Sequence, residues 1–564
     1  MMQDHISSMP ALWMLLGAAL IAVLPNRWRI IPAIVLPSIT LWCIWFSTGD
    51  SWQTTVMGYS LAPFQSDSVR QIFGTAFVIA AMLSLVFGVT IASKTESSAS
   101  MGYAGSAIGV AFAGDFLTFF VFWEMLAVFS TIIIWDGRTQ AARAAGFRYA
   151  LLHFMGGVVL LAGIAGLATQ GDLIIRPLPL ESLSAWLIFI GVLINAGAPP
   201  FSAWVADAYP EATPSGSVVL SAFTTKSAVL ALILLFPGES VLISIGLVMI
   251  FYGIIYALLE NDVRRILCYS IVNQVGFMVC AVGIGTDLAL NGAVAHAFTH
   301  IIYKALLLMS AGAVIAQTGL RKCTDLGGLA RSMPLTATFG IIGALAISAF
   351  PFTSGFVSKS LTSQAAIDAQ LLAVWLALTA ASAGVFLHAG IKFPWFVFFQ
   401  KDSGLRPSDP HLSMKLAMGV LATLCIGIGC APQLLYPYLP YTVTYVPYTT
   451  EHLVSQLQLL LFSGLAFFLT LPLMRRTLTL TLDFDWFYRV PLFRLSQLIR
   501  ESVAQHGSTF RLASHTVIQS KARVYVDKIF ASVMLGGRSH AGSTVAIVTS
   551  ALLIIVIISF VAFR

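Results

Sequence analysis

Long apolar runs recur along almost the whole chain, each about 20 residues long, which is the length of helix that crosses a bilayer. We find about 16 such segments by this criterion. Their approximate ranges are 9–25, 30–47, 72–92, 102–119, 120–135, 147–169, 184–208, 214–236, 239–259, 266–285, 289–316, 333–360, 368–391, 412–431, 454–474 and 543–563. The sequence does not show the shorter alternating runs of an outer-membrane barrel. Only 10% of the residues are charged, too few for a soluble protein of this length. The sequence therefore predicts an all-α polytopic membrane protein.

The positions of Lys and Arg predict its orientation. Their clusters follow odd-numbered segments: Arg27 and Arg29, Lys94, Arg138 and Arg143, Arg264 and Arg265, Arg321, Lys322 and Arg331, Lys401 and Arg406, and Arg475 and Arg476. Because cytoplasmic loops carry the excess of basic residues, we expect both termini to lie outside. The formal net charge of +7 fits this topology signal rather than a nucleic-acid partner.

Ionisable side chains inside apolar spans are costly in a bilayer, so they are candidates for function. Within the segments above, or near their ends, we find Glu124, His153, Lys226, His296, His300, Lys304, Lys359, His388 and Lys392.

Three of these candidates, His296, His300 and Lys304, are spaced four residues apart and share one face of a helix. Imidazoles titrate near neutral pH, and a buried amine can release its proton. The face predicts a proton relay, and a structural hydrogen-bonded cluster is the alternative. No carboxylate or Cys stands at a matching spacing, and the six cysteines form no CxxC. We therefore expect neither a metal site nor a cofactor.

Glu124 is an acid in an otherwise apolar helix. Alone in hydrocarbon it is protonated, whereas beside a buried lysine it is ionised. A Glu/Lys pair of this kind would be a switch for proton movement, and the alternative is a neutral Glu bonded to a neighbouring helix. Lys226 lies about 12 residues into its segment, too deep to reach the interface easily. A lone histidine such as His153 or His388 is more often packed than part of a relay.

Two segments are interrupted by Pro and Gly, at LINAGAPPFSAW (193–204) and at FPFTSGFVSK (350–359). The two interrupted segments lie five segments apart. Since an odd number of membrane crossings separates them, they have opposite orientations in the membrane. Segments 4–8 and 9–13 are therefore candidates for inverted repeats. The alternative is two ordinary proline kinks. We expect N-terminal helices over 1–101, a first half over 102–236, a second half over 237–391 and further helices over 392–474.

The region 475–542 mixes apolar and basic residues at helical spacing. We expect an amphipathic connector on the cytoplasmic surface, followed by a terminal span over 543–564. A solvated tail is the alternative.

Several motifs resemble one family, the proton-translocating antiporter-like subunits of respiratory complex I, membrane-bound hydrogenases and Mrp-type antiporters. They are FVFWEMLAV, WVADAYPEATPSGSVVLSAFTTKSAV, LLENDVRRILCYSIVNQVGFM, AHAFTHIIYKALLLMSAGAV and FPFTSGFVSKS, within about residues 100–365. The D-type subunit of Mrp antiporters is the most similar branch. The resemblance implies 14 core helices in two inverted five-helix repeats, each with a broken helix. It also implies a prokaryotic cell (inner) membrane as the location.

The resemblance also assigns roles to residues in a proton path. Glu124 matches the family's intramembrane glutamate, and Lys226 matches the lysine that passes the proton toward the centre. His296, His300 and Lys304 match the central relay, and Lys359 matches the terminal lysine. Asn195 stands where the family usually has a lysine, so Glu124 is left without its usual partner.

The resemblance implies a proton-translocating subunit whose partners are other membrane subunits, most simply in Mrp-type exchange of protons for Na⁺. One alternative is the membrane arm of a complex I-like NADH:quinone oxidoreductase or hydrogenase, in which this chain itself does no redox chemistry. A second is a non-conducting energy-coupling subunit, which Asn195 favours. The sequence does not decide whether the host complex is an enzyme.

Overall fold

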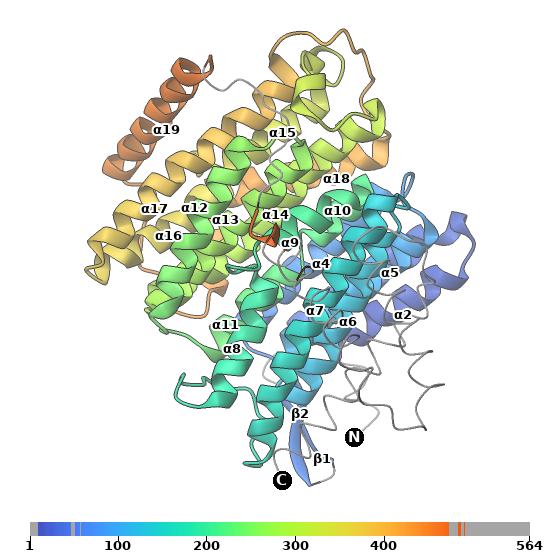
Figure 1. The fold of residues 1–564 in the computed structure, drawn as a ribbon, viewed down its shortest axis with the longest axis vertical. Helices are drawn as coiled ribbons and strands as arrows, with labels where there is room; N and C mark the ends of the chain where they lie inside the picture. The colour runs from blue at the N-terminus through green and yellow to red at the C-terminus, as the bar shows by residue number, and fades with distance from the viewer. Residues whose placement is uncertain are drawn as a thin grey trace, which may run out of the picture.

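The computed structural model describes residues 9–46, 51–56, 58–472, 483–486, 490 and 494. They form a bundle of packed helices with one small hairpin (Figure 1). Eleven helical stretches of this part are long and apolar enough to cross a membrane. The expected connector over 475–542, apart from 483–486, 490 and 494, and the expected span over 543–564 lie outside the described residues.

The N-terminal part contains α2 (Pro10–Val23), η1 (Asn26–Trp28), α3 (Ile30–Phe46), β1 (Ser51–Val56), β2 (Tyr59–Gln65) and α4 (Ser68–Gly88). The range 102–236, expected as the first half, begins within α5 (Lys94–Phe112). It continues with α6 (Phe116–Trp135), α7 (Gln140–Ala168), α8 (Leu183–Ala196), α9 (Ala203–Ala208), η2 (Tyr209–Glu211), α10 (Pro214–Leu220) and α11 (Thr224–Leu235).

The range 237–391, expected as the second half, contains α12 (Val241–Leu259), α13 (Val263–Ile284), α14 (Asp287–Thr318), η3 (Cys323–Asp325), η4 (Leu329–Arg331), α15 (Pro334–Ile347), α16 (Ser354–Asp368) and α17 (Leu372–Val385). It ends within the π-helical turn η5 (Phe386–Lys392), which a second one, η6 (Trp395–Phe399), follows. The helices α18 (Leu412–Cys430) and α19 (Thr450–Thr470) follow, with η7 (Pro432–Leu434) and η8 (Tyr436–Tyr438) between them.

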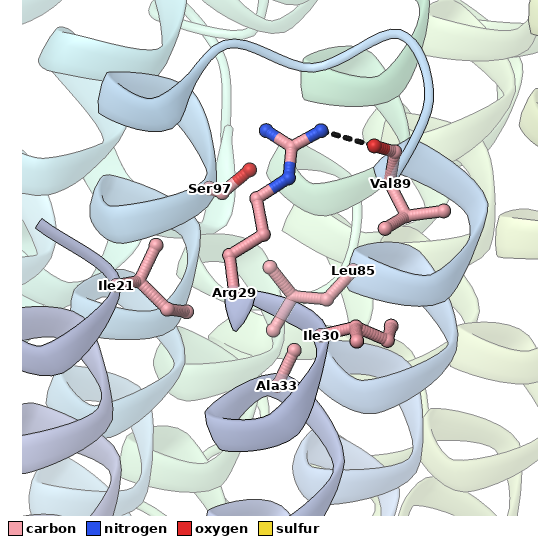
Figure 2. Close-up of a pocket in the computed structure, with 7 residues that line it drawn as sticks. All are labelled: Ile21, Arg29, Ile30, Ala33, Leu85, Val89 and Ser97. Carbon is pink, nitrogen blue, oxygen red and sulfur yellow. Dashed lines mark hydrogen bonds between the residues drawn. The ribbon is translucent and has the colours of Figure 1, made fainter. Parts of the chain in front are cut away.

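Arg29 joins the N-terminal helices to the end of α4. Its guanidinium donates to the carbonyl oxygens of Val89 and Ala92, the latter at 2.8 Å. Figure 2 shows this side chain beside Ile21 and Leu85, with its bond to Val89. Carbonyl groups at a helix end lack partners within the helix, so the arginine satisfies them.

Asp115, in the turn between α5 and α6, forms hydrogen bonds to both α6 and the β-hairpin. Its side chain accepts from the backbone N–H groups of Leu117 and Thr118, at 3.0 and 2.8 Å, and so caps α6. The second oxygen accepts from the Ala62 N–H of β2 at 3.1 Å. We did not predict this hairpin, because residues 51–65 are too short and too polar to register as a span.

Both expected helix breaks are present. The first separates α8 from α9 and begins at Gly197, whose φ of 76° suits a residue without a side chain. The second separates α15 from α16 and holds Ala349 and Phe352 at φ of 55° and 67°. A positive φ is uncommon for residues other than glycine and is a local strain.

Some boundaries differ from the sequence expectation. Helix α5 begins at Lys94 rather than near 102, because the Ser93 side chain caps its first turn. The hydroxyl groups of Ser97 and Ser100 donate to backbone carbonyl groups one turn earlier, so these polar residues fit within the helix. The segment expected over 214–236 is interrupted between Leu220 and Thr224. The segment expected to end at 391 continues through η5 and η6, so His388 and Lys392 lie inside it rather than near its end.

The helices α13 and α14 lie at the centre of the bundle and are almost fully enclosed by other helices (Figure 1). By contrast, α19 is largely exposed at the edge. Beyond α19, Asp483 binds the outer face of the second half, where its carboxylate accepts from Tyr252 and Tyr269 at 2.8 Å each.

We expect Asp115→Ala to lower the free energy of unfolding by about 2 kcal/mol, because the cap of α6 and the acceptor for Ala62 are both lost. Thermal unfolding of the purified protein in detergent measures this. Asp115→Asn keeps one acceptor oxygen and should recover part of the loss. A melting temperature unchanged in Asp115→Ala would contradict the assignment.

Candidate functional site

Glu124 on α6 packs against Gly157 of α7, a position without a side chain. Both carboxyl oxygens are buried and have no hydrogen-bond partner among the described residues. A Cβ added at Gly157 would lie 1.9 Å from Oε1, so the carboxyl group occupies the place where another residue would have a side chain. Within the described residues, Glu124 therefore has no cationic partner.

Asn195 lies at the C-terminal end of α8, next to the first break, and is 1% exposed. Its side-chain oxygen has no hydrogen-bond partner among the described residues. The preceding residue, Ile194, accepts from the Trp204 indole N–H at 3.0 Å across the break. An amide at this position cannot supply the charge that a lysine would bring to Glu124.

Lys226 on α11 is fully buried beside the interruption between α10 and α11. Its Nζ donates to the Ser221 carbonyl at 2.7 Å and to the Thr225 hydroxyl at 3.2 Å. The Ser221 carbonyl follows the last residue of α10, where helix geometry leaves carbonyl groups without an internal partner. The interruption thus provides the acceptor for the buried amine.

His296 on α14 takes part in a chain of hydrogen bonds that reaches α13 and α16. Its Nε2 lies 3.2 Å from Oε1 of Gln274, and its Nδ1 lies 3.0 Å from the Ser358 hydroxyl. Since a carbonyl oxygen only accepts, Nε2 carries the proton and Ser358 donates to Nδ1. Thr299 donates to Ser358 at 2.8 Å, and Tyr303 donates to Gln274 at 3.0 Å.

His300 and Lys304 follow on the same face of α14 and are both fully buried. Neither ring nitrogen of His300 has a hydrogen-bond partner among the described residues. The ring centroid lies 6.1 Å from that of His296 and 5.3 Å from that of Tyr303. Lys304 donates to the Leu267 carbonyl of α13 at 3.1 Å.

Lys359 on α16 is 5% exposed and lies at the second break. Its Nζ donates to the Ile347 carbonyl, at the end of α15, at 2.8 Å, and lies 4.9 Å from the centre of the Phe277 ring. It directly follows Ser358, the partner of His296. The predicted terminal lysine is therefore one residue away from the hydrogen-bond chain of the predicted relay.

The structure brings most of the predicted residues together in the interior. Lys226 on α11, Lys359 on α16 and the three candidates on α14 are all buried, and α14 packs against both α11 and α16. Glu124, by contrast, has no hydrogen bond or ion pair to this group within the described residues.

Two other predicted candidates have separate environments. Lys392 donates to the carbonyl oxygens of Ala257, Leu258 and Glu260 at the end of α12, at 3.0, 2.6 and 2.5 Å. This is a helix-capping contact. His388 is buried one turn before it and bonds to the Gly384 carbonyl at 2.9 Å.

Sequence reasoning missed Gln274, Thr299 and Ser358, which connect the relay residues. Neutral polar side chains inside the spans were the available signal, since buried polar groups in proteins are usually hydrogen-bonded. Ionisable side chains alone do not reveal these connections. Among the described residues, no group of three His, Cys, Asp or Glu side chains is placed to hold a metal ion.

Two groups of ion pairs hold neighbouring elements together, and one of them joins the two expected halves. Arg321, after α14, bonds to Asp262 at the start of α13 and to Glu211 of η2, the latter at 3.0 Å. Burial opposes the charge of Arg321, but the two carboxylates outweigh it and raise the pKa of this guanidinium. Arg148 on α7 forms a two-pronged pair with Asp207 of α9, at 2.8 and 2.9 Å.

Comparison with known proteins places residues 113–384 in a family described as NADH:quinone oxidoreductase/Mrp antiporter, transmembrane. The D-type subunit of the Na⁺/H⁺ antiporter of Alkalihalophilus pseudofirmus is 28% identical over 419 residues, which cover 68% of this chain and 84% of that protein. A probable K⁺/H⁺ antiporter protein of Rhizobium meliloti, of the A/B type, is 29% identical over 367 residues, or 60% of this chain. The match spans only 37% of that longer relative.

A similar fold occurs in a solved structure of the membrane-bound sulfane sulfur reductase, an archaeal respiratory membrane complex. The TM-score is 0.70 at 22% identity, over 97% of this chain and 99% of that one. At this identity the likeness shows a shared fold.

We expect Arg321→Met to lower the free energy of unfolding by about 1.5–3 kcal/mol, because two charged hydrogen bonds are lost, one of them to Glu211 in the other half. Thermal unfolding in detergent measures the loss. Arg406→Met is the matched control, since the Arg406–Asp402 pair is exposed and should matter little. Equal effects of the two substitutions would contradict a joining role for Arg321.

Proposed function

We propose that this chain, which belongs to the NADH:quinone oxidoreductase/Mrp antiporter family of membrane subunits, moves protons across the membrane as one subunit of a multi-subunit complex. The observation that carries this proposal is the buried group of titratable side chains around α14. Lys226, Lys304 and Lys359 surround His296 and His300 there, all at most 5% exposed. Such groups are costly in a membrane and are found where protons or ions move.

The second half supports the proposal through its hydrogen bonds. A proton on His296 can leave toward Ser358, which precedes Lys359, as hydroxyl and imidazole exchange roles as donor and acceptor. In the other direction, His300 lies between His296 and Lys304 on α14. Lys304, His300, His296 and Lys359 would form the path in this half, with Lys226 feeding it from the first half.

The arrangement of the breaks supports two inverted repeats, over 102–236 and 237–391. Each repeat would contain one broken helix, α8/α9 or α15/α16, at the corresponding place in the order of its helices. The remaining parts would be the helices over 1–101 and 392–474, the connector over 475–542 and the terminal span over 543–564. About 16 crossings and the basic loops would place both termini outside.

We propose Mrp-type exchange of protons for Na⁺ as the activity of the complex. The Na⁺/H⁺ antiporter relative from Alkalihalophilus pseudofirmus supports this choice, because the match covers 84% of its length. The alternative is a proton-pumping arm of a redox-driven complex, such as a complex I-like enzyme or a membrane-bound hydrogenase. The fold shared with the sulfane sulfur reductase complex favours this alternative.

Lys304→Ala tests the central relay. We expect proton flux to fall at least about 100-fold, the range in which loss of a positioned proton-transfer group acts. The measurement is proton flux in liposomes that hold the purified complex and a trapped pH-sensitive dye. Lys401→Ala is the matched control, because Lys401 is exposed outside the spans. Normal flux in Lys304→Ala, with all subunits still assembled, would refute the relay.

Identification of the partners and of the driving ion separates the two activities. We expect a tagged chain, purified in mild detergent, to bring down other multi-spanning subunits. We also expect a Na⁺ gradient alone to drive proton movement in liposomes that hold this complex. Co-purifying iron–sulfur proteins, together with flux that needs an electron donor, would replace antiport with the redox-driven alternative.

A further inference from the structure

His153 on α7 is a buried titratable group that the path described above does not use. It is 1% exposed, and its Nδ1 lies 3.1 Å from the Tyr149 carbonyl of its own helix. Since a carbonyl only accepts, Nδ1 carries the proton and Nε2 has a free lone pair. Nε2 is buried and has no hydrogen-bond partner among the described residues. A buried polar atom left in this state calls for an explanation.

The face of α7 that carries His153 extends to the place where the Glu124 carboxyl group packs. Tyr149, His153 and Gly157 are four residues apart, so they follow one another along one side of the helix. The Glu124 carboxyl group lies against Gly157, one turn beyond His153. Residues four apart are separated by about 6 Å along a helix, a gap that bridging water can cross.

The other end of the same face reaches the helix of Lys226. The rings of His153 and Tyr149 are stacked, with centroids 3.9 Å apart. The Tyr149 hydroxyl lies 3.4 Å from the hydroxyl of Thr224, which also bonds to Tyr103 at 2.5 Å. The next residue, Thr225, accepts from Lys226.

The same stretch of α7 also packs on the end of α8, which carries Asn195. A Cβ at Gly156 would lie 3.2 Å from Ile194, the neighbour of Asn195. Trp204, which donates to the Ile194 carbonyl across the first break, lies edge-on to His153 with ring centroids 4.5 Å apart. His153 is therefore a titratable group joined through Trp204 to the residue before Asn195.

We propose that His153 is the proton carrier of the first half, standing between Glu124 and Lys226 in place of a lysine at position 195. This rests on the proposed function, because it concerns the same proton path. The Glu124 carboxyl loses its proton as Nε2 gains one, through water. The proton then passes from the ring, again through water, to the hydroxyls of Tyr149 and Thr224, and from there through the Thr225 hydroxyl to the Lys226 amine. One O–H or N–H bond breaks and one forms at each step.

The surroundings of His153 allow the step to be isolated by substitution. The elements around it carry several titratable and charged groups. They are Lys94, Glu96 and Tyr103 of α5, Glu124 of α6, Arg143, Arg148 and Tyr149 of α7, Asp207 of α9, Tyr209 and Glu211 of η2, and Lys226 of α11. Arg148 and Asp207 neutralise one another in their ion pair.

His153→Phe removes both ring nitrogens and keeps an aromatic ring between Tyr149 and Trp204. We expect proton flux through the complex in liposomes to fall about 10-fold or more. Tyr149→Phe and Thr224→Val remove single hydroxyl groups with little change of shape, and each should also lower flux. Ser106→Ala is the matched control, since Ser106 bonds only within its own helix, to the Gly102 carbonyl.

Rescue distinguishes a proton carrier from a packing residue. In the Asn195→Lys background a cation is restored beside α7, so His153→Phe should regain most of the lost flux. Full flux in His153→Phe, where Lys304→Ala is inactive, overturns this inference and leaves the proposed function standing. A loss of flux that Asn195→Lys does not relieve assigns His153 to packing and also overturns the inference. Reduced assembly of the complex in His153→Phe, Tyr149→Phe and Thr224→Val alike does the same. Normal flux in Lys304→Ala refutes the proposed function itself.

Discussion

A buried ammonium group needs oxygen atoms around it, and the helix breaks of this protein supply them. Lys226 binds a carbonyl where α10 ends, Lys359 one where α15 ends, and Lys392 three at the end of α12. A continuous helix uses its carbonyl groups internally, and lipid offers no replacement. Lys304 is the exception, because its acceptor is the Leu267 carbonyl within the continuous helix α13. For the other three buried lysines of the described residues, helix ends supply the oxygen atoms that an apolar bundle lacks.

The two expected halves differ in how their buried polar side chains are hydrogen-bonded. In the second half, His296 is bonded at both nitrogens and leads through Ser358 to Lys359. In the first half, Glu124 and Asn195 keep buried oxygen atoms without partners among the described residues. An amide at 195 neither neutralises a carboxylate nor carries a proton. The second half also contains a group of this kind, because both ring nitrogens of His300 lack partners among the described residues. The face of α7 with Tyr149 and His153 extends to Gly157, against which the Glu124 carboxyl group packs.

Much of this arrangement can be predicted from the sequence. Every expected segment from 9–25 to 454–474 overlaps a helix, and both Pro/Gly interruptions are breaks, since apolar length and proline act locally. The spacing of His296, His300 and Lys304 placed them on one helix. Hydropathy did not reveal the break near Ser221 or the partners Gln274 and Ser358. Those depend on hydrogen bonds between residues distant in sequence, which no local pattern records.

The π-helical turns η5 and η6 have a consequence for comparing related chains. Each closes its hydrogen bonds over five residues instead of four, so each accommodates one residue more than a regular helix of the same form. Such a turn has the geometry that a regular helix would adopt if it took in one more residue without breaking. In a relative that lacks it, the residues equivalent to Lys392 and Phe399 stand at shifted positions along the chain. An alignment that keeps this helix free of gaps would pair Lys392 with a residue on the wrong side of it.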